Sequence, residues 1–386
     1  MIVALLGLLA SLATAGIAFS HPTRRRMEIS AAVLVLHLAA TGAYWLLAAD
    51  AGYDARFYYD DPLDWASKPV QTGSVAVIQF VQAMKAVFGG SFFAYFLFFQ
   101  AFGMIGCALL LRTFDEIAAA LGLVVPFVLY ALLFLPGLHL WTVAIGKDAP
   151  LFMAVSLSVW ASLRLSRRAG WMVLAVAIMA FIRPPVAVLV VIALLASLVL
   201  DRRLPLGGKI AIGLLAAVGL GFVLSAAQAQ LEIQTLDAKG VVDFVERNQT
   251  LGQKVGGGAD IVGLPYPLKL LSLLFRPFFF DAGGALGLIA SLENLILLGM
   301  FGYLAANFRV LARLMQSVPY LAYCVIFAAM LFATLALLNY NVGLGLRQKM
   351  MGMPAVLVVV ASVALYRRAS AAPPWRRQAP GMQAAG

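Results

Sequence analysis

Apolar runs of about 20 residues recur along the whole chain, and each is long enough to cross a bilayer as a helix. Of the 386 residues, 63% are hydrophobic and only 12% are charged, whereas about a quarter are charged in a soluble domain. A transmembrane barrel would instead show alternating segments of about ten residues. We therefore predict an all-α fold, with residues 1–368 forming a single polytopic membrane domain.

The apolar runs predict about eleven transmembrane helices. Their approximate ranges are 2–20, 29–48, 91–111, 117–137, 149–163, 170–182, 186–200, 210–229, 283–306, 319–338 and 351–366. Three arginines, Arg24 to Arg26, follow the first run, which favours an uncleaved span with an outer N-terminus over a signal peptide. Basic residues concentrate in the short loops of one side, which the positive-inside rule assigns to the cytoplasm. We expect residues 369–386 to form a disordered cytoplasmic tail.

Charge and cysteine usage narrow the function classes. The net charge of +11 is spread between the apolar runs, so no nucleic-acid partner is expected. The two cysteines, Cys107 and Cys324, lie inside apolar runs and predict neither a disulfide framework nor a thiolate metal site.

Three segments interrupt the spans on the predicted outer side. The first is an acidic loop over 49–90, whose second half, 74–88, predicts a helix lying in the interface. The second is a loop over 230–282 that ends in an interfacial or re-entrant segment. The third is the turn at Arg183-Pro184-Pro185 between two short apolar arms. Irregular backbone at membrane depth is tolerated only inside protein or along a cavity, so we expect Arg183 to lie in a cavity that opens outward.

Basic residues near the outer surface are candidate phosphate ligands. Arg183 and Arg276 each precede a proline at the end of an apolar arm, where a guanidinium can bind a lipid-linked phosphate in bidentate geometry. Lys147 and Asp148 open a span, and a helix N-terminus favours an anion. Arg347 could join this site or anchor the last helix. The alternatives are snorkelling, pairing with carboxylates and helix capping.

The acidic loop carries the candidate base. Asp54 lies just beyond the second span, where a carboxylate could deprotonate an acceptor hydroxyl. Arg56, Tyr58, Asp60 and Asp61 follow, and such residues can contact a sugar. Asp60 and Asp61 could instead bind a divalent cation, although adjacent acids alone are weak evidence. The alternative for the whole segment is a hydrated acidic loop.

Two further polar residues receive structural assignments. We expect His139 to be an interfacial histidine. Glu293 falls inside a predicted span, where an isolated acid is costly, so we expect it to have a structural partner.

The chain resembles the GT-C class of polytopic glycosyltransferases and bacterial oligosaccharide repeat-unit polymerases. The similar stretches are Tyr53-Asp54-Ala55-Arg56-Phe57-Tyr58-Tyr59, Gly146-Lys147-Asp148-Ala149, Ile182-Arg183-Pro184 and Leu274-Phe275-Arg276-Pro277. The resemblance implies sugar transfer from a polyprenyl-linked donor to a glycan or glycolipid acceptor, at the outer face of the bacterial cytoplasmic membrane. It also implies that Asp54 is the catalytic base and that no cofactor is required. An extra early span and the lack of a large C-terminal domain are departures from the GT-C pattern.

Two other classes of function remain open from the sequence. A transporter or flippase of a lipid-linked glycan would also need basic groups in a cavity, and transporters often contain repeated broken helices. A noncatalytic scaffold of an envelope complex would require neither Asp54 nor Arg183 individually.

Overall fold

The computed structural model describes residues 1–17, 24–49, 54–62, 68–201, 263–339 and 341–371, with the isolated positions 207, 210, 221, 224 and 261. The described residues are helical and contain no strand, which confirms the all-α prediction. Six helices in this part of the chain are long and apolar enough to span a membrane, and the predicted count of eleven spans is not confirmed. The six are Arg24–Ala48, Phe92–Ala120, Leu165–Ile182, Gly284–Ala306, Pro319–Leu338 and Met353–Ala371.

The N-terminal half is organised around one long helix, α5. The elements in order are α1 (Ile2–Ile17), α2 (Arg24–Ala48), α3 (Asp54–Asp60), α4 (Ser74–Phe88) and α5 (Phe92–Ala120). Helix α5 packs against α1, α2 and α8 (Asp148–Ser162). A Cβ atom on Gly7 would lie 2.0 Å from the Leu97 carbonyl oxygen, so glycine permits the close approach of α1 to α5. Helix α4 matches the predicted interfacial helix in extent.

The predicted fourth span, 117–137, is wrong as a single helix. Helix α5 continues only to Ala120, and three short elements follow, namely α6 (Phe127–Ala131), the 3₁₀ helix η1 (Leu132–Phe134) and α7 (Pro136–Leu140). Gly122 adopts a φ of +65°, and Pro126 and Pro136 precede or begin the next helices. Proline lacks the backbone N–H and clashes with the preceding turn. The helix therefore ends here, although the sequence remains apolar.

The turn at Arg183 has the predicted form, but its first arm is longer than expected. Helix α9 (Leu165–Ile182) begins five residues before the predicted 170–182 arm, and α10 (Pro184–Leu200) follows it after one residue. Arg183 adopts φ −151° and ψ 75°, and Pro184 at the first helical position starts α10 without the loss of a hydrogen bond. Most of the predicted 210–229 span, and residues 230–260 of the second outer loop, lie outside the described residues.

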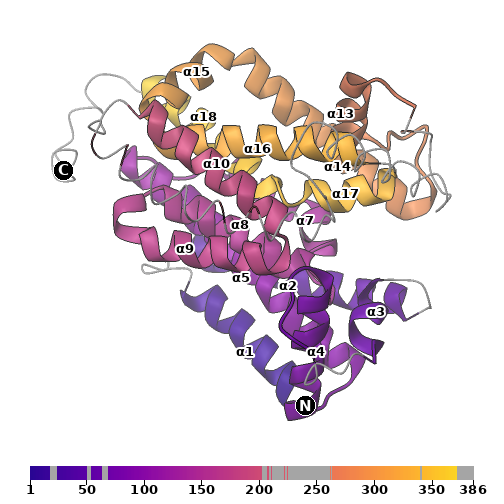
Figure 1. The fold of residues 1–386 in the computed structure, drawn as a ribbon. Coiled ribbons are helices and arrows are strands. Elements are labelled where there is room, and N and C mark those ends of the chain that lie inside the picture. The colour runs from indigo at the N-terminus through magenta and orange to yellow at the C-terminus, as the bar shows by residue number, and fades with distance from the viewer. Residues whose placement is uncertain are drawn as a thin grey trace.

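The C-terminal half of the chain packs against α8 and α10. Its helices are α13 (Tyr266–Phe275), α14 (Gly284–Ala306), α15 (Phe308–Ser317), α16 (Pro319–Leu338), α17 (Val342–Lys349) and α18 (Met353–Ala371). Helix α16 packs against α10 and α18, and these helices lie at the opposite side of the fold from α1 and α4 (Figure 1). Helix α18 extends to Ala371, three residues into the predicted tail, and residues 372–386 lie outside the described part of the chain.

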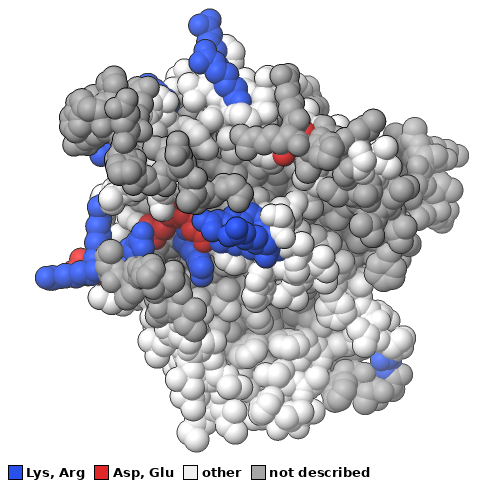
Figure 2. All heavy atoms as spheres, turned by 90° about the vertical axis from the view of Figure 1, so that its left-hand side faces the viewer, with Lys and Arg blue, Asp and Glu red and all other residues white. Residues whose placement is uncertain are grey.

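Charged residues also gather at the C-terminal end of α5. Asp115 pairs with Arg26 at 3.1 Å, and Glu116 pairs with Arg112 at 3.0 Å and with Arg168 at 2.7 Å. In Figure 2, acidic side chains are flanked by basic ones on the face shown, and uncharged side chains lie below them. The structure therefore brings Arg26, Arg112 and Arg168 together at one end of α5.

Candidate active site

A cavity of about 240 Å³ lies where α3, the start of α4, the loop before α8, the α9–α10 turn and α17 meet. It brings together six of the ten residues predicted from the sequence, although these lie as much as 293 positions apart in the chain. The lining consists of Asp54, Phe57, Tyr58, Ser74, Lys147, Asp148, Arg183, Leu344, Arg347 and Gln348. We refer to it as the charged cavity.

Arg347 joins the two acidic residues of the charged cavity. Its Nε donates a hydrogen bond to Asp148 Oδ2 and its Nη1 donates one to Asp54 Oδ2. Burial alone would lower the pKa of Arg347, but Asp148 and Asp54 outweigh burial and raise the pKa above its ordinary value. Helix α17 is fixed at its start by Asn341, whose side chain accepts a hydrogen bond from the Gly343 N–H at 2.7 Å.

Lys147 reaches across the charged cavity to the start of α4. Its Nζ donates a hydrogen bond to Ser74 Oγ at 2.9 Å, and the Tyr58 hydroxyl donates to the same oxygen at 3.4 Å. Burial, followed by the nearby charge of Arg183, lowers the pKa of Lys147 to about 8. Burial raises the pKa of Tyr58, which keeps its hydroxyl protonated. The charge of Lys147 is therefore sensitive to pH near neutrality.

Arg183 is the cation of the cavity whose guanidinium forms no hydrogen bond or ion pair with another residue in the described part of the chain. Burial lowers its pKa, but an arginine stays charged at neutral pH. The lining holds three cationic residues, Lys147, Arg183 and Arg347, against two carboxylates, so its formal charge is +1 when Lys147 is protonated. An anion bound at Arg183 would satisfy this excess charge.

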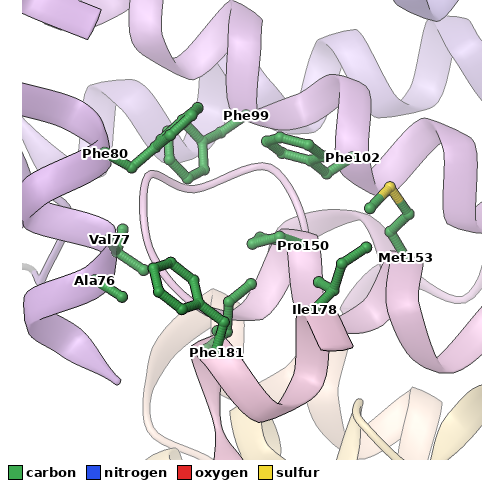
Figure 3. Close-up of a pocket in the computed structure, with 10 residues that line it drawn as sticks. Ala76, Val77, Phe80, Phe99, Phe102, Pro150, Met153, Ile178 and Phe181 are labelled. Atoms are coloured by element: carbon green, nitrogen blue, oxygen red, sulfur yellow. The ribbon is translucent and has the colours of Figure 1, made fainter. Parts of the chain in front are cut away.

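An apolar pocket of about 190 Å³ adjoins the charged cavity. In Figure 3, Phe99 and Phe102 of α5 face α4 on one side and α8 and α9 on the other. The pocket is lined by Ala76, Val77, Phe80, Phe99, Phe102, Pro150, Met153, Ile178, Phe181 and Ile182.

Three backbone segments line both the apolar pocket and the charged cavity. Ile182 directly precedes Arg183, Pro150 lies two residues after Asp148, and Ala76 lies two residues after Ser74. The charged cavity and the apolar pocket are thus formed in part by the same three stretches of chain.

The other four predicted site residues do not line the charged cavity. Arg276 follows α13, pairs with Asp281 at 2.6 Å and lies outside the lining that contains Arg183. The Arg276 guanidinium is thus already paired with the carboxylate of Asp281, five residues later in the chain.

Arg56 points to the other side of α3. Its guanidinium carbon lies 4.2 Å from the centre of the Phe92 ring, and its Nη1 lies 3.5 Å from Asp60 Oδ2. Asp61 accepts a hydrogen bond at its backbone carbonyl from Gln82 at 2.8 Å. Because a short helix presents only some of its residues to one side, only Asp54, Phe57 and Tyr58 of α3 reach the cavity.

Several polar positions were missed or misassigned from the sequence. Ser74 and Gln348 line the charged cavity, and the signals that could have found them are the N-terminal position of Ser74 in the interfacial helix and the adjacency of Gln348 to Arg347. His139 is buried rather than interfacial. Glu293 has the expected structural partner, because it accepts a hydrogen bond from the Gly137 N–H at 2.6 Å.

No protein-family model, curated protein or solved structure matches this chain. Fold and cavity together define an all-helical protein with membrane-length apolar helices and a charged cavity beside an apolar pocket.

Proposed function

We propose that the protein is an integral-membrane glycosyltransferase that uses a polyprenyl phosphate or pyrophosphate sugar donor in bacterial cell-surface polysaccharide or glycolipid assembly. The observation that carries this proposal is Arg183, which lines the charged cavity, forms no hydrogen bond or ion pair among the described residues, and directly follows Ile182 of the apolar pocket. A lipid-linked phosphate combines an anion with a hydrocarbon chain, and this site offers complementary surfaces to both.

In this proposal the donor binds in both the charged cavity and the apolar pocket. The phosphate binds Arg183, assisted by Lys147 and Arg347, while the first isoprene units lie against Phe99, Phe102 and other side chains of the apolar pocket. Removal of this chain from the bilayer costs little, because the pocket is as apolar as the lipid interior. The phosphate contacts orient the donor, and fixed cations stabilise the charge that develops on the leaving phosphate.

Sugar transfer then requires a base on the acceptor side. The acceptor oxygen forms a bond to the anomeric carbon while the bond from that carbon to the donor phosphate oxygen breaks. The bonding electrons remain on the phosphate, and the acceptor proton passes to Asp54. The Asp54 side chain is 58% exposed, which leaves room for an acceptor beside it.

Arg347 links phosphate binding to the base. In the structure its guanidinium contacts Asp54 and Asp148 together. A bound donor phosphate competes with the Asp54 carboxylate for this guanidinium and frees it to turn towards the acceptor, while Asp148 keeps Arg347 in place.

We infer the orientation of the protein from the arginine-rich end of α5. The arginine-rich end of α5 faces the cytoplasm under the positive-inside rule, so the charged cavity opens at the outer face of the cytoplasmic membrane. The N-terminus then lies outside and the C-terminus inside.

The test is the profile of lipid-linked saccharides and surface glycan in cells that carry wild type, a deletion, Asp54→Asn or Arg183→Ala at matched protein levels. Asp60→Asn and Arg276→Ala are the matched controls, because these residues lie outside the cavity lining. We expect both cavity variants to match the deletion and both controls to match wild type. Truncated intermediates indicate a single-sugar transferase, and complete single repeats indicate a polymerase.

Two outcomes contradict the proposal. Normal glycan in Asp54→Asn, together with intact intermediates trapped on the cytoplasmic face in Arg183→Ala, indicates a flippase. Normal glycan in both variants, with loss only on deletion, indicates a noncatalytic scaffold.

A further inference from the structure

Two buried histidines and a buried cysteine meet at the junction of three helices. His37 lies in α2, Cys107 in α5 and His139 in α7, and each is at most 1% exposed. The Nδ1 atoms of the two histidines are 3.0 Å apart. The candidate ligand atoms of all three residues lie within 4.8 Å of one another. The glycosyl-transfer proposal uses none of these residues.

The hydrogen bonds of the two rings leave both Nδ1 atoms without a proton. His37 Nε2 lies 2.9 Å from the Gln100 carbonyl oxygen, and His139 Nε2 lies 2.8 Å from the Leu133 carbonyl oxygen. A carbonyl oxygen only accepts, so each Nε2 carries the hydrogen of its ring. A neutral imidazole has a single N–H, and therefore two Nδ1 lone pairs face each other at 3.0 Å. This contact is repulsive unless a cation lies between or beside the two nitrogens.

A shared proton does not satisfy this arrangement well. It would leave a full positive charge in the protein interior, which is costly without a counter-charge. Among the described residues, no hydrogen bond or ion pair joins either ring to a carboxylate. The nearby group that can supply a negative charge is Cys107, as a thiolate, and thiolates bind soft metal ions strongly.

We propose that His37, Cys107 and His139 form a buried site for a thiophilic d¹⁰ metal ion, Cu⁺ or Zn²⁺, held by two imidazole Nδ1 atoms and the Cys107 thiolate. On binding, Cys107 releases its thiol proton to solvent and its sulfur donates an electron pair to the metal. The pairing of each Nε2 with a backbone carbonyl is the arrangement that orients metal-ligating histidines.

The geometry accommodates an ion with a small adjustment. With metal–nitrogen bonds of about 2.0–2.1 Å, nitrogens 3.0 Å apart subtend about 95° at the metal. Cys107 must approach somewhat, because donors to one ion lie within about 4.4 Å of each other. A Cu⁺ ion with one thiolate carries no net charge, which suits a fully buried site, whereas Zn²⁺ leaves +1 and is almost always four-coordinate in structural sites. The structure thus favours Cu⁺ of the two.

Close packing places the ligands together. A Cβ atom on Gly103 would lie 2.6 Å from His37 Nε2 and 2.4 Å from the Thr142 carbonyl oxygen, so only glycine lets α2 and the segment after α7 approach α5 here. The metal would tie α2, α5 and α7 together at the start of the segment that ends in Lys147.

The test is the metal content of the purified full-length protein in detergent, measured by elemental mass spectrometry before and after incubation with buffered Cu⁺ or with Zn²⁺. We expect about one metal ion per chain in wild type, and at least a tenfold loss in Cys107→Ala. Cys324→Ala is the matched control, because Cys324 is equally buried and belongs to no ligand group in the described part of the chain. A metal chelator should lower the Tm of wild type and of Cys324→Ala, and leave Cys107→Ala unchanged.

Each result decides the question. Copper or zinc at one equivalent identifies the ion. Wild type that neither contains nor takes up either ion overturns the proposal, as does a Cys107→Ala variant that keeps its metal. If Cys107→Ala does not fold, X-ray absorption at the metal edge of wild type decides, because a shell without both nitrogen and sulfur ligands contradicts the assignment.

Discussion

Arg347 and Asp148, which are 199 positions apart in the sequence, are joined by a hydrogen bond from Arg347 Nε to Asp148 Oδ2. The same guanidinium reaches Asp54 through Nη1. Helix α17 is thereby held against α8 and α3. The two carboxylates differ in environment, because the Asp148 side chain is 11% exposed whereas that of Asp54 is 58% exposed.

Stability should respond differently to the loss of each carboxylate charge. We expect Asp148→Asn to lower the free energy of unfolding by about 1–3 kcal/mol, because it weakens a largely buried charged hydrogen bond. Asp54→Asn should cost about 0–1 kcal/mol, as for an exposed pair, while abolishing sugar transfer. Thermal unfolding in detergent checks both values. A large loss of Tm in Asp54→Asn would mean that its glycan phenotype reflects folding rather than chemistry.

Binding of a prenyl phosphate should weaken as the pH rises. Lys147, with a pKa of about 8, is protonated below that pH and neutral above it. The apparent Kd should therefore rise up to about tenfold from pH 7 to pH 9, as the protonated fraction falls from about nine-tenths to one-tenth. Lys147→Arg stays charged, and its Kd should lack this rise. Equal pH profiles for the two proteins would exclude Lys147 from the anion site.

Partial filling of the apolar pocket should weaken the binding of long-chain donors. Ile178→Trp adds bulk to a pocket residue of α9, and we expect a Kd for a long prenyl phosphate at least tenfold above that of wild type. Affinity for a water-soluble short-chain analogue should change little. Val173→Trp is the control, since Val173 lies on the same helix, is 68% exposed and does not line the pocket. An equal loss of affinity for both ligands in Ile178→Trp would argue against a chain-binding role.

The contact between α1 and α5 should depend on Gly7. Gly7→Ala places a Cβ against the Leu97 backbone, and overpacking of this kind costs about 1–3 kcal/mol. In contrast, Gly42→Ala meets no atom within 4 Å and should be neutral or stabilising by up to about 1 kcal/mol. Protease sensitivity and Tm in detergent compare the two. If Gly7→Ala unfolds no more easily than Gly42→Ala, α1 contributes little to the packed core.

The sequence predicted helix positions well where apolar composition decides them. The α9–α10 turn at Arg183 was predicted because two prolines cannot continue a helix. The same rule applied to Pro126 and Pro136. It was overlooked because residues 117–137 are apolar throughout, and hydropathy depends on side chains and not on backbone hydrogen bonds.

The structure places some of the predicted site residues in one cavity and others elsewhere. Asp54, Lys147, Arg183 and Arg347 were chosen because each lies next to a predicted span on the outer side, and all four line one cavity. Arg276 met the same criterion but pairs with Asp281. Whether an arginine faces a carboxylate or an open cavity depends on tertiary contacts, which a single sequence does not encode locally.

The link from Arg347 to Asp54 and Asp148 also determines when the charged cavity is completed during synthesis. The ribosome must deliver α17 before the two acidic residues acquire their shared partner. A chain that is translated only as far as α16 therefore contains Asp54, Asp148 and the Arg183 turn but lacks Arg347, which joins the two carboxylates. The charged cavity is therefore complete only after the helices that precede α17 have been made.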